Sequence, residues 1–343
     1  MKDKNRSIGI NINVLIGVLL GMVVVVIGLV VLKMMGDDAG NQDVSNNQSV
    51  VSTENGTVEK WQEGIIRYDG VDYRYNNDIR TFLFMGIDKA AEVTEGVNGI
   101  DGGQSDAMFL LVVNPDTEKI SVVAINRNTM TDVDVYGTDG NYIGTSELQI
   151  CLQHGYGDGM RTSCTRTVNT VSRMFDNIPI AGYFAINMNG LPILNDAVGG
   201  VTVEVLEDIE SYGHTLKKGE TVNLMGTQSL AYVRSRDINE FDSATRRLER
   251  QQQYIISLMS KVKGVAAQGE DAIMAMYESA EDYIVTNIDF LELAEAGVAY
   301  EFNPTNMYTI PGETIMGARF EEHYIDENAL YDMIIEIFYE EVE

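Results

Sequence analysis

Five arginines lie close together in a chain that is otherwise acidic. They fall within 17 residues, although the whole 343-residue chain has only 14 arginines: Arg234, Arg236, Arg246, Arg247 and Arg250. Guanidinium groups bind phosphate oxygens through paired hydrogen bonds and keep their charge when they are partly buried. The stretch therefore predicts a site for phosphate or pyrophosphate.

The spacing indicates which of these side chains act together. Arg247 and Arg250 are three residues apart on a predicted helix, and Gln251 is four from Arg247, so these three share a helix face. Arg234 and Arg236 are two apart and point the same way where the chain is extended. The alternative is a solvated surface on which the arginines pair with Asp237, Glu240, Asp242 and Glu249.

Two acids flank the predicted apolar strands. Asp88 follows the strand 80–87, and Asp106 precedes the strand 107–114. In open α/β sheets the loops at strand ends build the ligand site, so we expect both carboxylates at one rim, with Arg127 as a further cation there. Two carboxylates, together with phosphate oxygens and waters, are ligands that Mg²⁺ prefers, although a single strand-end aspartate more often forms a turn.

The remaining reactive side chains carry weaker signals. The three histidines lack metal-ligand spacing, His154 fits a structural role best, and no serine or cysteine lies in a nucleophile-elbow pattern. Cys151 and Cys164 permit either one disulfide or two free buried thiols. Without a histidine cluster these cysteines do not indicate a zinc site.

Composition restricts the partners. The formal net charge is −28, from 24 Lys plus Arg and 52 Asp plus Glu. Such a surface repels nucleic acid and anionic head groups, so we expect no nucleic-acid partner and infer that an anion must bind in a local basic pocket. The hydrophobic content of 45% is sufficient for a sizeable core.

The N-terminus predicts a membrane anchor. Three basic residues precede an apolar run over residues 8–35, which is long enough to span the hydrocarbon core. The basic residues keep the tail 1–7 in the cytoplasm. A cleaved signal peptide is the alternative, but no small-residue cleavage pattern closes the run. Residues 36–62 then predict a polar extracellular linker, and 63–343 an extracellular domain.

The hydrophobic pattern predicts a layered α/β fold. A hairpin is expected at 65–75, because Asp69-Gly70 separates two alternating segments. Strands are expected at 80–87, 107–114, 119–126, 183–186, 201–206, 307–310 and 322–325. Helices are expected at 146–156, 163–175 with a Ser163 cap, 191–197, 226–234, 244–263, 271–283, 289–300 and 327–339.

Six short segments occur in an order that resembles the LytR-CpsA-Psr family of cell-wall enzymes, over about residues 81–263. They are Gly86-Ile87-Asp88, Ser105-Asp106-Ala107-Met108, Ile125-Asn126-Arg127-Asn128-Thr129, Gly199-Gly200-Val201, Leu230-Ala231-Tyr232-Val233-Arg234-Ser235-Arg236, and Arg247 to Gln251. The resemblance implies a cytoplasmic tail, one membrane helix and an extracellular three-layer αβα domain with a central mixed sheet. It places the protein in a Gram-positive-type envelope.

The resemblance also implies an activity. The implied activity is that of an Mg²⁺-dependent phosphotransferase, which moves a glycopolymer from a polyprenyl-pyrophosphate carrier to a peptidoglycan sugar hydroxyl. The glycopolymer is of the teichoic acid or capsular polysaccharide type. Asp88 and Asp106 match the metal-associated acids, and these two with Arg127 form the implied catalytic group. The implied pyrophosphate contacts are Arg127, Arg234, Arg236, Arg247 and Gln251, with Arg250 as a further motif arginine.

The chain departs from the family pattern at four positions. Lys89 and Gln104 stand where arginine is common, and Asn128 and Ala244 stand where aspartate is common. These departures keep open a second function, a non-catalytic protein that binds the lipid carrier or the wall polymer. A polyprenyl chain also needs an apolar slot, and the resemblance suggests that residues 168–175 and 191–198 line it.

Overall fold

A computed structural model describes residues 52–53, 56–57, 59–60, 64–96, 100–237, 239–288 and 301–342 of the chain. The predicted anchor at 8–35 and the predicted helix at 289–300 lie outside these residues, as does most of the linker. Within the described ranges, no helix is both long enough and apolar enough to cross a membrane.

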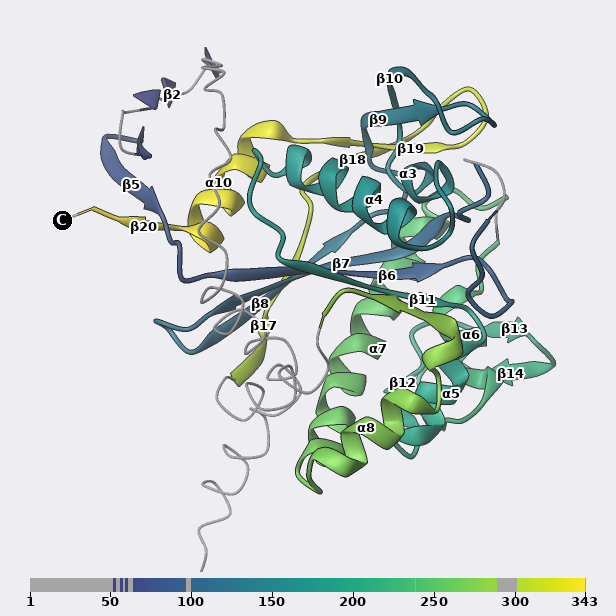
Figure 1. The fold of residues 1–343 in the computed structure, drawn as a ribbon. Helices are drawn as coiled ribbons and strands as arrows, with labels where there is room; N and C mark the ends of the chain where they lie inside the picture. Colours follow the sequence, from purple (N-terminus) through teal and green to yellow (C-terminus); the bar gives the residue numbers. More distant parts are fainter. Residues whose placement is uncertain are drawn as a thin grey trace, which may run out of the picture.

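A mixed sheet forms the centre of the molecule (Figure 1). Its described strands run in the order β16-β11-β6-β7-β8-β17: β16 (Ile284–Thr286), β11 (Gly182–Asn187), β6 (Arg80–Ile87), β7 (Ser105–Asn114), β8 (Lys119–Ile125) and β17 (Glu301–Thr309). The pairs β11–β6 and β8–β17 are parallel, and the other three pairs are antiparallel. The prediction of a central mixed sheet is confirmed.

Side chains alternate across this sheet and build a hydrophobic cluster on each face. Along β7, Phe109 and Leu111 pack on one side, whereas Met108 and Leu110 pack on the other. Both faces are therefore apolar, which explains why these strands are nearly continuous hydrophobic runs in the sequence.

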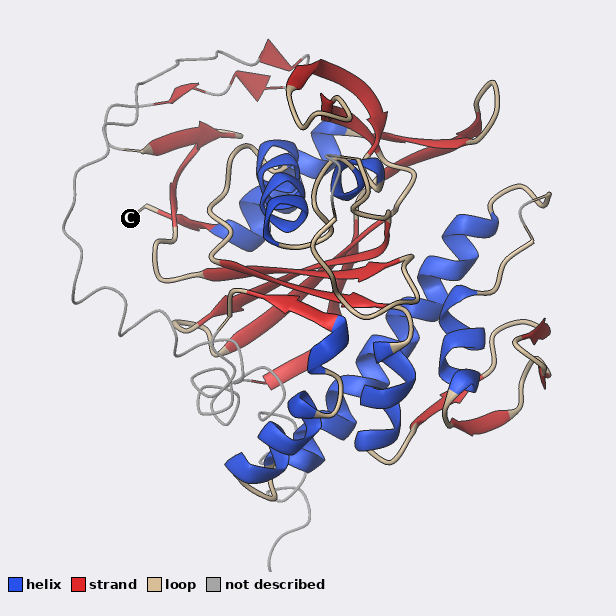
Figure 2. Ribbon diagram, turned by 45° about the vertical axis from the view of Figure 1, so that its right-hand side comes forward, coloured by secondary structure: helices blue, strands red, loops and turns tan. Residues whose placement is uncertain are grey.

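Helices cover both faces of the sheet (Figure 2). On one side lie α3 (Leu152–Gly155), α4 (Arg161–Met174) and α10 (Glu327–Phe338). On the other lie α5 (Gly190–Ala197), α6 (Thr227–Arg234), α7 (Ser243–Ala266) and α8 (Glu270–Glu278), followed by the 3-10 turn η2 (Glu281–Tyr283). The expected three-layer αβα arrangement is confirmed.

Smaller sheets surround this core. The predicted hairpin is confirmed as β4 (Ile65–Tyr68) and β5 (Val71–Tyr75), flanked by β3 (Glu59–Lys60) and by the C-terminal β20 (Tyr339–Glu341). The other two-stranded pairs are β1 (Ser52–Thr53) with β2 (Gly56–Thr57), β12 (Val201–Glu204) with β15 (Thr221–Leu224), β13 (Ile209–Ser211) with β14 (His214–Leu216), and β18 (Gly312–Met316) with β19 (Glu321–Ile325).

The helix predicted at 146–156 is largely wrong. Residues Tyr142–Gln149 form β10, which pairs with β9 (Met130–Tyr136), and only the short α3 follows. Pairing with the preceding strand decides the conformation here, because β10 forms an antiparallel hairpin with β9, and these backbone hydrogen bonds leave no trace in the apolar periodicity of residues 146–156.

The predicted cap of the next helix is also wrong. The helix α4 begins at Arg161, so Ser163 lies within its first turn. The backbone N–H groups at the start of α4 donate instead to Asp158. Its side chain accepts from the N–H groups of Met160, Thr162 and Ser163. An acid at this end also suits the helix dipole.

Candidate active site

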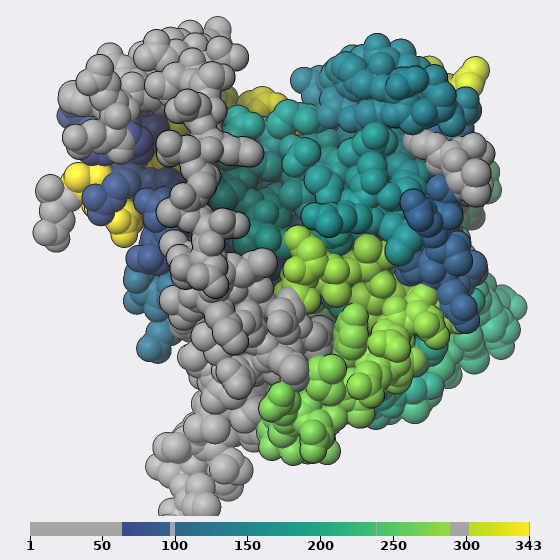
Figure 3. Space-filling model, in the orientation of Figure 1, coloured from purple at the N-terminus to yellow at the C-terminus, as the bar shows by residue number. Residues whose placement is uncertain are grey.

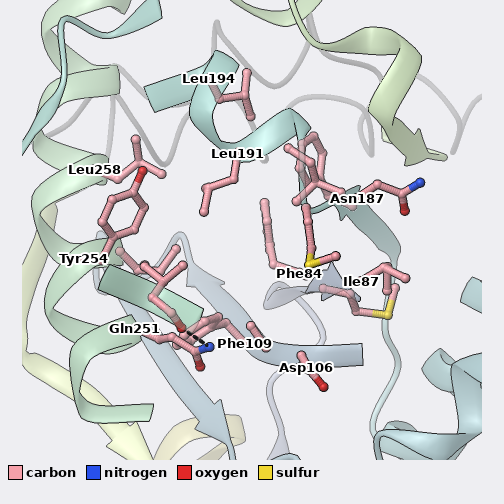
Figure 4. Close-up of a pocket in the computed structure, with 18 of the residues that line it drawn as sticks. Phe84, Ile87, Asp106, Phe109, Asn187, Leu191, Leu194, Gln251, Tyr254 and Leu258 are labelled. Carbon is pink, nitrogen blue, oxygen red and sulfur yellow. Dashed lines mark hydrogen bonds between the residues drawn. The ribbon is translucent and has the colours of Figure 1, made fainter. Parts of the chain in front are cut away.

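A cavity of about 280 Å³ lies between the sheet and the helices α5 to α8. Figure 4 shows Leu191 and Leu194 on one side and Tyr254 and Leu258 on another, with Phe84 and Phe109 in the sheet below. On the surface in Figure 3, the light-green residues of α8, η2 and β16 lie below the teal α4 layer. Met276 of α8 and Ile284 of β16 also line the cavity, so these two elements form part of its wall.

Polar groups gather at one end of this apolar space. The cavity lining includes two acids, two arginines and a glutamine: Asp88, Asp106, Arg234, Arg247 and Gln251. Asp106 and Gln251 lie on the side away from Leu194 in Figure 4. The cavity therefore has an apolar body and a charged mouth, as a ligand with a hydrocarbon tail and an anionic head requires.

A β-bulge places Asp106 at this mouth. Gly86 pairs with Ala107 and Ile87 pairs with Ser105, so Asp106 is the extra residue in β7. Without the bulge, Asp106 would share the face of Met108 on the far side of the sheet. The extra residue turns the carboxylate toward the cavity, which is a common use of bulges beside ligand sites.

Asp106 joins two arginines from different elements. Its Oδ1 lies 2.7 Å from Nη1 of Arg127, and its Oδ2 accepts from Nη1 of Arg247 at 3.3 Å. The Arg247 side chain is only 4% exposed. Burial lowers the pKa of Arg247 to about 10, which the positive charges of Arg127, Arg236 and Arg250 favour and Asp106 opposes. Arg247 still carries its charge at neutral pH.

Asp88 lies at the same end of the β6–β7 pair. Its backbone N–H donates to the Gln104 carbonyl at 3.0 Å, and its Oδ1 accepts from the Gln104 N–H at 2.6 Å. Gly103 permits this approach: its φ is +75°, and a Cβ there would lie 3.0 Å from Asp88 Oδ1. The loop between β6 and β7, which contains Gly103 and Gln104, therefore holds one face of this carboxylate.

Arg127 follows β8 and contacts Gln104 in the loop between β6 and β7 and Cys151 just before α3. Its Nη2 donates to Gln104 Oε1 and lies 3.0 Å from Cys151 Sγ. Burial is the largest influence on the pKa of Cys151 and raises it, while the neighbouring Arg127 opposes this.

Cys151 and Cys164 are both free and buried, and Cys164 Sγ lies instead 3.8 Å from His154 Nε2. The structure therefore has the two free thiols and not the disulfide.

Two further arginines come from the end of α6 and the loop after it, and of these only Arg234 lines the cavity. Arg234 is the last residue of the helix and donates to the Tyr212 hydroxyl. Arg236 lies in the loop that follows. Its pKa is lowered by burial and by the charge of Arg127, while Asp106 and Glu321 raise it. Arg127, Arg236 and Arg247 thus share one electrostatic environment around Asp106.

Arg250 has a different position from its neighbours. It is 1% exposed, its guanidinium donates to the carbonyls of Tyr232 and Ser235, and its Nε lies 2.8 Å from Glu207 Oε1. It does not line the cavity, although Arg247 and Gln251 do. The predicted shared face therefore holds for Arg247 and Gln251 only, and Arg250 fastens the end of α6 to α7.

The apolar slot was predicted half correctly. Leu191 and Leu194 line the cavity as expected. Residues 168–175 do not: Val171 and Phe175 pack in the cluster on the opposite face of the sheet with Phe338 of α10. Amphipathic periodicity identifies a buried helix face but not which face of a sheet it covers.

A family model, the LytR_cpsA_psr family, matches residues 40–335. The chain belongs to this family. A polyisoprenyl-teichoic acid–peptidoglycan teichoic acid transferase TagU of Bacillus licheniformis is 25% identical over 267 residues, covering 76% of this chain and 78% of that protein. The TagU of Halalkalibacterium halodurans is 33% identical over 156 residues, covering 46% of this chain and 44% of that protein, less than half of each.

A solved structure of a LytR_cpsA_psr relative has the same fold. The crystal structure of Bacillus subtilis TagU aligns with a TM-score of 0.52 at 22% identity, covering 75% of this chain and 94% of that one. The central sheet and its two helical layers are therefore those of a known architecture.

The departures from the LytR_cpsA_psr pattern have defined surroundings here. Lys89 pairs with Asp101 at 3.4 Å, and Gln104 accepts from Arg127. Ala244 is buried in the first turn of α7, and Asp242 precedes that helix with a φ of 64°. Asn128 is buried and donates to Glu321 at 3.3 Å.

Glu321 and Tyr254 were missed by the sequence analysis. Tyr254 follows Arg247 and Gln251 on the cavity face of α7, so helical spacing was a usable signal. Glu321 lies 193 residues after Asn128, and nothing in the sequence pattern joins the two.

Proposed function

We propose that this protein is a phosphotransferase that attaches a polyprenyl-pyrophosphate-linked glycopolymer, of the teichoic acid or capsular polysaccharide type, to a peptidoglycan sugar hydroxyl. The observation that carries the proposal is the cavity itself. Its body is lined by side chains such as Phe84, Leu194 and Leu258, and its mouth by Asp88, Asp106 and Arg247. A polyprenyl chain fits the first part and a pyrophosphate the second. The names of the TagU relatives support the same reaction.

The arginines bind the pyrophosphate in this proposal. Arg234 and Arg247 line the mouth directly, and Arg127 and Arg236 share its electrostatic field. Gln251 donates to the Val233 carbonyl at 3.0 Å, which fixes its amide beside the same mouth. Guanidinium groups held in place before the reaction stabilise the charge that moves onto the bridging oxygen.

We propose Mg²⁺ as the cofactor, held by Asp88 and Asp106. Asp106 Oδ1 is buried, and the contact that it makes is the ion pair with Arg127 Nη1 at 2.7 Å, so the ion would share this oxygen with Arg127 or displace the guanidinium. No cluster of three or more His, Cys, Asp or Glu side chains occurs among the described residues. The other ligands would be phosphate oxygens and waters, as is usual for Mg²⁺. When bound, the ion would neutralise phosphate charge and polarise the phosphorus.

The reaction is a displacement at phosphorus. The oxygen of the acceptor hydroxyl forms a bond to the sugar-linked phosphorus, the bond from that phosphorus to the bridging oxygen breaks, and polyprenyl phosphate leaves. We assign the hydroxyl proton to Asp88. Asp106 is less available for this role, because both oxygens of its carboxylate already face guanidinium groups.

The site of action is proposed from the N-terminal sequence. The apolar run 8–35 would form a single-pass anchor, with residues 1–7 in the cytoplasm and the domain outside the cell. This location places the domain on the same surface as peptidoglycan and the lipid-linked polymer.

A second candidate function is binding without catalysis. It is favoured by the neutral Asn128 and by Lys89, which pairs with Asp101. A single measurement distinguishes the two functions. It is the release of polyprenyl phosphate from a polyprenyl-pyrophosphate analogue, with and without Mg²⁺.

Asp88→Ala tests the enzymatic proposal. We expect Mg²⁺-dependent release by the full chain to fall by about 100-fold or more, the usual effect of removing a general base. Asp101→Ala is the matched control, since Asp101 is exposed and does not line the cavity. Binding of the analogue without release by the unmodified protein would reject the enzyme and favour the binding protein.

A further inference from the structure

The hairpin β13–β14 lies beside α6, the helix that ends in Arg234 (Figure 1). At the base of the hairpin, Ile209 pairs with Leu216, and both side chains are buried in the hydrophobic cluster on this face of the sheet. Closer to the tip, His214 Nε2 lies 2.8 Å from Oγ1 of Thr227, the first residue of α6. The hairpin is therefore held both by its base and against the start of this helix.

The tip of the hairpin reaches the other end of α6. Ser211 pairs with His214, so Tyr212 and Gly213 form a two-residue turn. The Tyr212 hydroxyl accepts a hydrogen bond from Arg234 Nη1. Within the described ranges, no other side chain makes a hydrogen bond or an ion pair with the Arg234 guanidinium. Arg234 lines the cavity mouth and Tyr212 does not, so a residue from outside the cavity contacts one of its arginines.

The turn has an unusual residue at its first position. The φ angles are 52° at Tyr212 and 76° at Gly213, and positive φ at both positions is the pattern of a type I′ turn. Such turns favour Asn or Asp before Gly, because a bulky side chain at positive φ crowds the backbone. Of the other five described non-glycine residues with positive φ, four are Asp or Asn. A tyrosine is therefore unfavourable for the turn, which indicates that its side chain serves another purpose.

We propose that Tyr212 is a positioning residue of the active site, whose hydroxyl holds the Arg234 guanidinium at the cavity mouth, where it receives the pyrophosphate. The inference rests on the proposed function, since it assumes that Arg234 binds pyrophosphate. Without the hydroxyl, the ligand itself would have to order the Arg234 side chain, and the loss of rotamer freedom would oppose binding. The hairpin β13–β14 thus takes part in the site from outside the cavity.

The first test removes only the hydroxyl. Binding of farnesyl pyrophosphate to the full chain in detergent is measured by calorimetry. Tyr212→Phe keeps the ring, and we expect about fivefold weaker binding. Affinity for farnesol, which has no pyrophosphate, should not change. Tyr142→Phe is the matched control, because Tyr142 is an exposed tyrosine in another hairpin and its hydroxyl lies 2.7 Å from Thr145 Oγ1; neither affinity should change in this variant.

A second test separates positioning from the stability of the turn. Tyr212→Asn gives the turn a favoured residue, so the urea midpoint of unfolding should rise, while the affinity for farnesyl pyrophosphate should fall by about fivefold. Arg234→Gln should also weaken binding. Adding Tyr212→Phe to Arg234→Gln should cause little further loss, since the tyrosine acts through the arginine.

The outcomes are distinct. If the unmodified chain does not bind farnesyl pyrophosphate, both the proposed function and this inference are rejected. If it binds, and Tyr212→Phe binds equally well, only the inference is rejected. Positioning would also be overturned if Tyr212→Phe lost affinity for farnesol to the same extent, if its loss persisted in full beside Arg234→Gln, or if Tyr212→Asn unfolded at a lower urea concentration.

Discussion

Neighbouring arginines on one helix have different tasks in this protein. Arg247 is buried against Asp106 at the cavity mouth, whereas Arg250 is buried against Glu207 and two backbone carbonyls at the end of α6. Residue type and spacing placed both in one phosphate site, because sequence does not show how far a helix is rotated about its axis. The side on which each guanidinium finds its acceptors decides the role.

Arg250→Gln should therefore destabilise the fold. Removal of the guanidinium leaves the carbonyls of Tyr232 and Ser235 without their buried donor and Glu207 with Arg246 alone, and we expect the free energy of unfolding to fall by about 2 kcal/mol. Urea denaturation measures this change. Arg246→Gln is the control: Arg246 also pairs with Glu207 but is 36% exposed, so it should cost less than about 1 kcal/mol. Equal stability of both variants would contradict the assignment.

His154 predicts an acid-sensitive fold. Burial lowers the pKa of its imidazole to about 4 from the usual 6.5, with Lys89 acting in the same direction and Asp158 opposing. Nδ1 lies 3.1 Å from the Gly103 carbonyl oxygen, which selects the neutral tautomer protonated there. As the pH falls below 6.5, the unfolded chain gains a proton and the folded chain does not. Stability from this residue is therefore present above pH 6.5 and is lost on acidification.

The size of this effect can be measured by comparing how steeply the free energy of unfolding falls with pH in the unmodified protein and in a variant without His154. Between pH 6.5 and 5 the unmodified protein should lose about 1.5 kcal/mol of unfolding free energy through His154. The variant His154→Gln will be less stable at pH 7, but its stability should fall less steeply over the same interval. Parallel pH profiles for the two proteins would show that His154 is not the titrating group.

At the scale of elements, the site depends on strand ends and on one helix. The bulge in β7 turns Asp106 toward the cavity, and α7 supplies Arg247, Gln251, Tyr254 and Leu258 along one side of it. In the proposed function, the first turns of α7 would therefore contact the head of the ligand and the later turns its tail. This division predicts that the two parts of the ligand can be separated by mutation.

Leu258→Trp should block the tail and leave the head group's site intact. The larger indole fills the apolar body, so the affinity for farnesyl pyrophosphate should fall by about tenfold, the equivalent of about two buried methylene groups. Affinity for inorganic pyrophosphate should not change. Ser260→Trp is the control, because Ser260 is exposed on the same helix. A parallel loss of both ligands would show that the cavity does not hold a hydrocarbon chain.

The same elements show what the sequence could predict. Strands β6 and β8 and helices α5 and α10 lie within a residue or two of their predicted bounds, because each has a clear apolar period and a turn at its end. The strand β10 was missed, since its partner β9 supplies hydrogen bonds that no local pattern records.

The candidate site was predictable in its chemistry but not in its boundaries. Asp88, Asp106, Arg234, Arg247 and Gln251 all line the mouth, as their types and motif order indicated. The exclusion of Arg250 and the contact between Asn128 and Glu321 depend on tertiary structure. Contacts between residues 128 and 321 arise only once the C-terminal hairpin has folded back.

At the scale of the whole molecule, the C-terminal part belongs to the same domain as the motifs. Strand β17 extends the central sheet beside β8, and β20 pairs with β5. Helix α10 packs on the same face of the central sheet as α4. The protein is strongly acidic, with a net charge of −28, yet its cavity mouth gathers arginines. An anionic ligand is therefore repelled by most of the surface and attracted at one place.

The proposed anchor adds a constraint on how the ligand reaches that place. A polyprenyl-linked polymer stays in the membrane, so an enzyme tied to the same membrane meets it at a raised effective concentration. The predicted linker 36–62 would set how closely the domain approaches the bilayer. The anchor would then hold the enzyme near its membrane-borne substrate, and the cavity would bind that substrate.

Cutting the chain within the linker tests this role. A protease site placed there allows the same preparation, in lipid vesicles, to be assayed before and after cleavage. Transfer from a vesicle-borne long-chain substrate should fall by about 100-fold or more, because the gain from confinement is lost. Turnover of a soluble short-chain analogue should stay within about threefold, since the cavity is unchanged. Equal losses on both substrates would show that residues 1–35 serve something other than access to the membrane.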